Sequence, residues 1–226
     1  MASVASLREH LVEELNDLLN AEEQLIEALP EMAQRATSRE LRTAFRSHLA
    51  ETRQHKKRVT QALKQLGERA AGKTCEAMEG LLTEGEELMK GSDAGSLRDA
   101  MMITAAQKVE HYEIATYGTV RTYARVIGER GVARLLQQTL KEEHAADKKL
   151  TRIAEGSVNR RASEEYNEQS GMFEKGAAWV GSTVGGALKR VMPRSTAADR
   201  GGNRRRTTKK AKGGARGRKR ARSSSR

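Results

Sequence analysis

The chain contains one cysteine, two prolines and only 3% aromatic residues among its 226 positions. A single cysteine, Cys75, excludes a framework of internal disulfides and suits a reducing compartment, so we expect a cytoplasmic protein. No early apolar run has the length of a signal peptide, and none approaches a membrane span, so we expect no transmembrane segment. Leu, Ala, Glu, Lys and Arg dominate, which is typical of helical bundles rather than of sheet proteins.

The net charge of +12 is distributed unevenly along the chain. Residues 189–226 contain 16 Lys and Arg against one acidic residue, a balance of +15. The other 188 residues contain 26 basic and 29 acidic residues, a balance of −3. A nearly neutral body with a strongly basic tail indicates a polyanionic partner for the tail alone.

The spacing of apolar residues predicts four long helices, over residues 4–35, 38–66, 96–127 and 132–155. Pro30 lies inside the first pattern, and we expect it to bend that helix rather than to end it. A short helix over residues 75–82 is expected in the long crossover between the second and third helices. Two helical hairpins joined by a long crossover indicate an all-α, ferritin-like antiparallel four-helix bundle with a short fifth helix.

Carboxylates interrupt the apolar stripe of the third predicted helix, which runs Ile103, Ala106, Glu110, Glu113, Tyr117 and Val120. Two acids one turn apart therefore face the expected core. Because burying a bare carboxylate costs several kcal/mol, such a pair needs protons, cationic partners or metal ions. The other predicted helices carry further candidates. Glu22 lies within the apolar stripe of the first helix, and Glu142 and Glu143 lie midway along the fourth. In the second helix, whose stripe includes Leu49, one edge of the stripe carries His48, Glu51 and His55.

These carboxylates share one height along the expected bundle. In an antiparallel helix pair, residues equally far from the turn lie side by side. Glu22 and Glu51 are equally far from a turn near Thr37, and Glu113 and Glu143 are equally far from Gly128. Each carboxylate is then about 20 Å from its turn, at roughly 1.5 Å per residue. Four helices would place them in one layer.

Five segments resemble the YciE/YciF-type ferritin-like family across residues 4–155: Ala21-Glu22-x-Gln24-Leu25, His48-Leu49-x-Glu51-Thr52, Cys75-x-Ala77-Met78-x-Gly80-Leu81, Lys108 to Gly118, and Leu140-x-Glu142-Glu143. The resemblance implies a four-helix, ferritin-like fold with a dinuclear metal site and a stress-related role. It does not extend to the tail. By the resemblance Glu142 is equivalent to Glu51, whereas helical phase places Glu143 closer to the stripe centre, so both stay candidates.

The predicted metal ligands are Glu22, His48, Glu51, Glu110, Glu113, Glu142 and Glu143. Carboxylates bridge two cations and offset their charge, while an imidazole supplies a neutral nitrogen. His48, one turn before Glu51, is the preferred nitrogen ligand, and His55 is the reserve. We expect two iron ions, with manganese as the alternative. Ferritin-like bundles typically carry Glu-x-x-His on two helices, whereas Gln54 and Ala145 stand at the corresponding positions here.

The expected domain organisation is a bundle over residues 1–156, a linker with a weakly amphipathic Gly-rich segment over 157–192, and a disordered basic tail over 193–226. No aromatic residue interrupts the tail, so any nucleic-acid binding would depend on phosphate neutralisation rather than on base stacking. DNA or RNA is the favoured partner, and an anionic membrane is the rival. The predicted nucleic-acid-binding residues are Arg204, Arg205, Arg206, Lys209, Lys210, Lys212, Arg216, Arg218, Lys219, Arg220 and Arg222.

Two functional interpretations follow from these features. The favoured one is a di-metal stress protein held on nucleic acid, and so nucleoid-associated, to which ferroxidase or peroxide-consuming activity would be an extension. The alternative is a metal-free helical scaffold whose tail binds the nucleoid or a membrane. An oxygenase or catalase-like enzyme would need a substrate pocket, which the sequence does not reveal. In each case we expect a homodimer or a higher homo-oligomer.

Overall fold

The structure is a computed structural model that describes residues 5–168. These residues form five α-helices and no strand: α1 (Leu7–Arg35), α2 (Arg39–Gln65), α3 (Glu76–Lys90), α4 (Ser96–Val126) and α5 (Arg130–Ile153). The predicted all-α fold and its four long helices are confirmed. The helix in the crossover is longer than predicted, because it continues to Lys90. The Gly-rich segment and the basic tail predicted beyond residue 168 lie outside the described residues.

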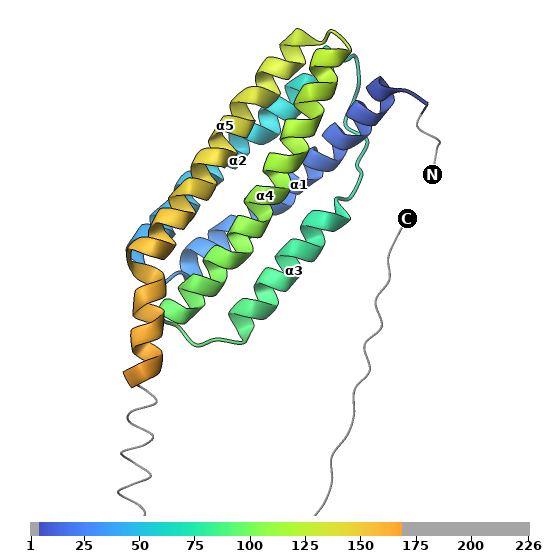
Figure 1. Cartoon of the computed structure of the whole chain (residues 1–226). Coiled ribbons are helices and arrows are strands. Elements are labelled where there is room, and N and C mark those ends of the chain that lie inside the picture. The colour runs from blue at the N-terminus through green and yellow to red at the C-terminus, as the bar shows by residue number, and fades with distance from the viewer. Residues whose placement is uncertain (1–4, 169–226) are drawn as a thin grey trace, which may run out of the picture. The chain divides into compact units, whose positions relative to one another are not determined.

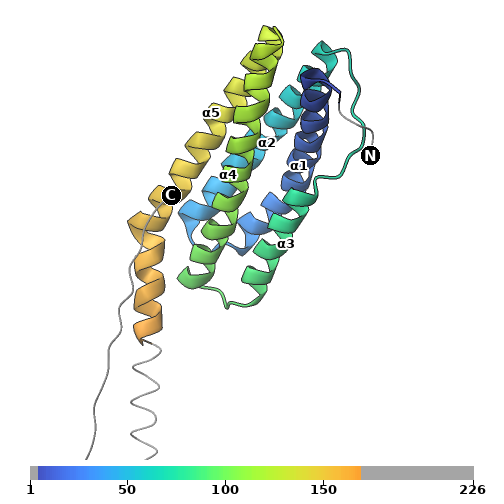
Figure 2. The ribbon, with the colours of Figure 1, turned by 45° about the vertical axis from the view of Figure 1, so that its right-hand side comes forward.

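The four long helices form two antiparallel hairpins that pack side by side (Figure 1). α1 pairs with α2 and α4 pairs with α5, while α2 packs against α5 and α1 against α4. The crossover after α2 leads to α3, which lies beside α4 and also contacts α1 (Figure 2). α3 therefore covers the side of the bundle where α1 and α4 meet.

Side-chain caps fix where the helices begin and hold the turns together. The hydroxyl of Ser38 accepts a hydrogen bond from the Leu41 amide and caps the N-terminus of α2. The carboxylate of Asp99 in α4 accepts hydrogen bonds from the Thr37 and Ser38 amides at 2.8 and 2.6 Å, which ties the α1–α2 turn to α4. As predicted, α1 runs through Pro30 and ends only at Arg35.

The crossover between the two hairpins is fastened to α1 by two asparagines. Asn16 accepts a hydrogen bond from the Ala71 amide at 2.7 Å, and Asn20 accepts one from the Cys75 amide at 2.8 Å. Cys75 is buried and caps α3, and its sulfur lies 3.1 Å from the Tyr112 hydroxyl. These contacts place the start of α3 against α1 and α4.

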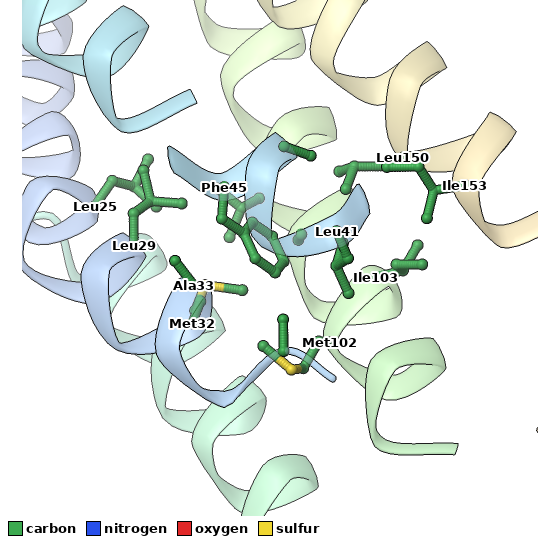
Figure 3. Close-up of a cluster of buried hydrophobic side chains, with 14 of the residues drawn as sticks. Leu25, Leu29, Met32, Ala33, Leu41, Phe45, Met102, Ile103, Leu150 and Ile153 are labelled. Carbon is green, nitrogen blue, oxygen red and sulfur yellow. The ribbon is translucent and has the colours of Figure 1, made fainter. Parts of the chain in front are cut away.

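Two apolar clusters make up the core, one toward each end of the bundle. Leu25, Leu29, Phe45, Met102 and Leu150 belong to the first cluster, at the end of the bundle that holds the α1–α2 turn (Figure 3). The second cluster contains Leu11, Leu15, Leu18, Val59, Leu63, Tyr117, Val120, Leu136 and Leu140. In α2, α4 and α5, buried acids and histidines lie between residues of the two clusters along the sequence, and in α1 Glu22 directly follows Ala21, the first residue of that helix in the first cluster. The core is therefore split by a polar layer at mid-height.

The chain stays helical past the end of α5. A π-helical turn covers Ala154–Val158, and residues 159–168, which fall in the predicted linker, are helical. Glu165 accepts hydrogen bonds from the Ser96 amide at 2.9 Å and from the Ser96 hydroxyl at 2.8 Å, and so caps α4. Within residues 5–168, no helix combines the length and the apolar character needed to cross a membrane.

Candidate metal centre

The polar layer consists of four carboxylates and two imidazoles contributed by all four long helices. They are Glu22 from α1, His48 and His55 from α2, Glu110 and Glu113 from α4, and Glu143 from α5. Glu22, Glu113, Glu143 and His55 are 0% exposed, Glu110 is 3% exposed and His48 is 7% exposed. Acidic residues are almost never fully buried unless they are paired, so this concentration requires a physical explanation.

Two overlapping groups of potential ligand atoms occur within the layer. His48, Glu110, Glu113 and Glu143 each offer one such atom, and these four atoms lie within 4.8 Å of one another. Glu22, His55 and Glu143 form a second group under the same limit. Glu143 belongs to both groups, so its carboxylate connects two candidate metal positions. Carboxylates that connect two cations are characteristic of dinuclear sites in helical bundles.

Both histidines take part, one in each group. Nε2 of His48 lies 3.3 Å from Oε1 of Glu110, and Nδ1 of His55 lies 2.8 Å from Oε1 of Glu143. The predicted position of both histidines at the edge of the α2 stripe is wrong, because both are buried whereas Leu49 is only partly buried. Buried residues of α2 follow one another at helical spacing as Leu41, Phe45, His48, Thr52, His55 and Val59.

Glu51, a predicted ligand, belongs to neither group. Its side chain is 43% exposed and lies with Oε2 3.5 Å from Nδ1 of His48. The close contact with His48 is the main cause that lowers the pKa of Glu51 below its usual range. The next residue, Thr52, is 0% exposed and occupies the inward direction at this height. Glu51 therefore flanks the layer beside His48.

Glu142 and Glu143, which the sequence left as alternatives, face different surroundings. Glu143 is in the layer, whereas Glu142 forms two contacts with Arg58 at 2.6 and 3.0 Å. Glu142 also lies 2.9 Å from Nε2 of His55. Although burial alone would raise the pKa of Glu142, its hydrogen bonds and charge interactions with Arg58 and His55 lower it overall. Glu142 is thus an ionised partner for the outer nitrogen of His55.

Tyr117, for which the sequence favours a packing role but allows an approach to the layer, is a neighbour of the layer. Its hydroxyl donates a hydrogen bond to Oε1 of Glu22 at 2.5 Å, and the side chain is completely buried. Its position four residues after Glu113, on the same helical face, was the available signal. Tyr117 satisfies one oxygen of Glu22 and leaves Oε2 directed to the layer.

Most carboxylate oxygens and ring nitrogens of the layer lack a hydrogen-bond partner within the protein. Among the described residues, nine of the eleven buried side-chain nitrogen and oxygen atoms without a hydrogen bond belong to Glu22, His48, His55, Glu110, Glu113 and Glu143. Burial raises the pKa values of Glu22, Glu110 and Glu143 above their usual range, and raises the pKa of Glu113 to about 7. Buried carboxylates and imidazoles with free lone pairs are a donor set suited to iron or manganese. The residues therefore fit a metal centre.

Four antiparallel helices around such a layer define the class of ferritin-like helical-bundle proteins. The family model for DUF892, a domain of unknown function, matches residues 6–163, and this chain belongs to that family. The protein YciF of Escherichia coli (strain K12) is 43% identical over 149 residues, which make up 66% of this chain and 90% of that protein. The predicted resemblance to YciE/YciF-type proteins is confirmed.

Solved structures of relatives have the same fold. The structure of the E. coli stress protein YciF has a TM-score of 0.67 at 40% identity and covers 69% of this chain and 99% of that one. YcfI from Rhodopseudomonas palustris has a TM-score of 0.64 at 38% identity, over 66% of this chain and 95% of that one. A protein from Xanthomonas campestris pv. campestris, at 23% identity and a TM-score of 0.57, covers 71% of this chain and 99% of that chain and shows the fold alone.

The predicted nucleic-acid-binding residues, from Arg204 to Arg222, lie outside the described residues. They also lie beyond the residues that the family model matches, which end at residue 163. The tail is therefore a feature of this chain that the family assignment does not explain.

Proposed function

We propose that this protein binds two metal ions in the carboxylate–histidine layer, with iron favoured and manganese as the alternative. The observation that carries the proposal is the set of nine buried, unpartnered ligand atoms in one layer. Leaving a buried acceptor unsatisfied costs about 1–3 kcal/mol, and more for a charged group. Two divalent cations would satisfy these atoms and offset the charge of the four carboxylates.

The two groups of ligand atoms suggest how the ions would be held. His48, Glu110, Glu113 and Glu143 would hold one ion, and Glu22, His55 and Glu143 the other. Glu142 and Tyr117 would act on the ligands, through hydrogen bonds to His55 and Glu22 respectively. Iron bound there would supply redox chemistry toward dioxygen or peroxide, which is the basis for a ferroxidase or peroxide-consuming activity.

The stress-related role and the nucleic-acid partner rest on separate features. YciF, the 43% identical relative, is described as a stress protein, and we extend that role to this chain. The tail carries 15 net positive charges in 38 residues, which favours a polyanion as its partner. Together these features support a metal-binding protein of the cytoplasm that is held near DNA or RNA by its tail.

The metal-free scaffold explains the layer less well. A scaffold would need a proton or a hydrogen-bond partner for each buried polar atom. Both carboxylate oxygens of Glu113 and both of Glu143 have none within the protein. Burying four such acids without a ligand would lower stability and add no packing advantage. We therefore favour the metal-binding function.

Substitutions of Glu by Gln test the proposal. Glu143→Gln should reduce the metal content of the purified full chain from about two ions to less than one, because both ligand groups lose a shared carboxylate. Glu23→Gln is the control, since it makes the same chemical change in a side chain that is 42% exposed, pairs with Lys56 and lies outside both groups. Glu110→Ala and Glu113→Ala should also lose metal. Elemental analysis after expression with iron and manganese provides the measurement, and full metal content in the Glu143 and Glu113 variants would end the assignment.

A further inference from the structure

A cavity of about 490 Å³ lies between the helices on one side of the metal layer. Its walls come from all five helices and are mostly apolar. Leu25, Leu29 and Met32 of α1 face Phe45 of α2, Met102 of α4 and Leu150 of α5 across the first core cluster (Figure 3). Leu81, Leu82 and Met89 of α3 complete the lining. Pockets for small organic ligands typically measure about 300–1,000 Å³, so this cavity has the size of a ligand site.

The cavity reaches the proposed metal centre. His48 and Glu110 line the cavity and also belong to the first group of ligand atoms. Oε2 of Glu110 is buried and has no hydrogen-bond partner within the protein. A molecule in the cavity would therefore have apolar walls around most of its surface and a metal-ligand pair at one end.

The charges around the cavity select against an anion. Four carboxylates outside the proposed ligand groups line it, those of Glu27, Glu31, Glu51 and Glu86, against the two cations Lys149 and Arg152. An acidic ligand would meet like charge, and any ion would lose its hydration among apolar side chains. An uncharged ligand avoids both costs.

Three methionines give the walls room to adapt to such a ligand. Met32, Met89 and Met102 all line the cavity and are buried. Methionine is unbranched and flexible, so it fits ligands of varied shape better than branched side chains do.

We propose that this cavity binds an uncharged, mostly apolar organic molecule of the size of a medium-chain alcohol, with one end against His48 and Glu110. The inference rests on the proposed metal-binding function, because it assigns to that centre a neighbouring organic ligand. It also supplies the pocket that an enzyme acting on an organic substrate would require.

The test uses the metal-loaded full chain and the neutral fluorescent probe N-phenyl-1-naphthylamine. We expect each chain to bind one probe molecule. 1-Decanol should displace the probe at a concentration about tenfold or more below the concentration of decanoate that is needed. Decanoate has the same chain length as decanol but carries a negative charge. Ala28→Phe and Ala106→Phe, which fill the cavity from α1 and α4, should weaken probe binding about tenfold or more. Ala100→Phe in α4 is the matched control, because Ala100 is partly buried but does not line the cavity.

The outcomes separate this proposal from the metal-binding function. Probe binding in a chain that takes up no metal would refute the metal centre but leave the pocket standing. Full metal content without probe binding that decanol displaces would overturn the pocket alone. Equal displacement by decanoate, or equal loss of binding in the Ala100 variant, would also overturn it. Ala28 is only partly buried, so its variant keeps the test decisive if Ala106→Phe fails to fold.

Discussion

Replacing Glu113 by Gln changes the charge of the layer while keeping nearly the same side-chain shape. Glu113 is fully buried, and burial raises its pKa to about 7 from its ordinary value of 4.5. Between these two pH values, the folded metal-free protein retains a proton that the unfolded chain has released. The free energy of unfolding should therefore fall as pH rises from 4.5 to about 7 and then level off.

The magnitude follows from the size of the pKa difference. One pKa unit corresponds to about 1.4 kcal/mol, so Glu113 alone would lower the stability of the metal-free protein by about 3 kcal/mol across this window. Burial raises the pKa values of Glu22, Glu110 and Glu143 as well, and these effects have the same sign. Burial also lowers the pKa of His55, and this shift has the opposite effect on stability. The free energy of unfolding rises as pH increases from the lowered pKa of His55 in the folded protein to its ordinary pKa in the unfolded chain.

Urea unfolding of the metal-free full chain at about pH 5 and about pH 8 measures the effect. The unmodified chain should lose about 3 kcal/mol more than Glu113→Gln between these conditions. Because Glu113 and His55 interact electrostatically, this difference includes the change that the substitution causes in His55. Adding iron or manganese at the higher pH should restore the stability of the unmodified chain, since metal replaces the missing protons. An identical pH dependence in the two proteins, or no stabilisation by metal, would refute the electrostatic reasoning.

Two further predictions concern the tail and the assembly. DNA binding by the full chain should show a slope of log affinity against log salt of roughly −6 to −9, if about half of the 16 basic residues each contribute about −0.9. A variant with six of these residues changed to Gln should show a slope shallower by about 3 on two unrelated duplexes; the six are Arg204, Arg205, Arg206, Lys209, Lys210 and Lys212. If the affinity of the unmodified chain does not change with salt, phosphate binding by the tail is contradicted. Sedimentation equilibrium should give a mass of two or more chains, and a monomer at every concentration would contradict a homo-oligomer.

The fold followed from the sequence because its elements are long and strongly periodic. All six residues of the predicted α4 stripe, from Ile103 to Val120, are buried, the two acids included. The turn at Gly128 adopts φ +87°, a conformation that favours glycine, and it fixed the register of α4 against α5. Glu113 and Glu143, equally far from that turn, share a ligand group in the structure.

Register along α2 was harder to predict, because the turn before it is less sharply marked. α1 ends at Arg35 and α2 begins at Arg39, so the midpoint of the turn could be placed only to within about one residue. An error of one residue changes the height by only about 1.5 Å but rotates the side chain by about 100°. The turn therefore predicts the height of Glu51 along the bundle, but it does not predict the direction in which the Glu51 side chain points. Thr52 faces inward, and His48 and His55 lie one turn to either side of it.

Glu142 and Glu143, which are adjacent in α5, contact the two different ring nitrogens of His55. Arg58 contacts Glu142 at 2.6 and 3.0 Å, and with His55 it keeps the pKa of Glu142 low, so this carboxylate is ionised and accepts a hydrogen bond from Nε2 of His55. Burial lowers the pKa of His55, so its ring is neutral with its single proton on Nε2. Nδ1 then directs a lone pair at the layer, 2.8 Å from Glu143. A cation between Nδ1 and Glu143 would meet a ligand that needs neither to lose a proton nor to rotate. The two acids that the sequence offered as alternatives thus serve one proposed metal position, Glu143 from inside the layer and Glu142 from behind the imidazole.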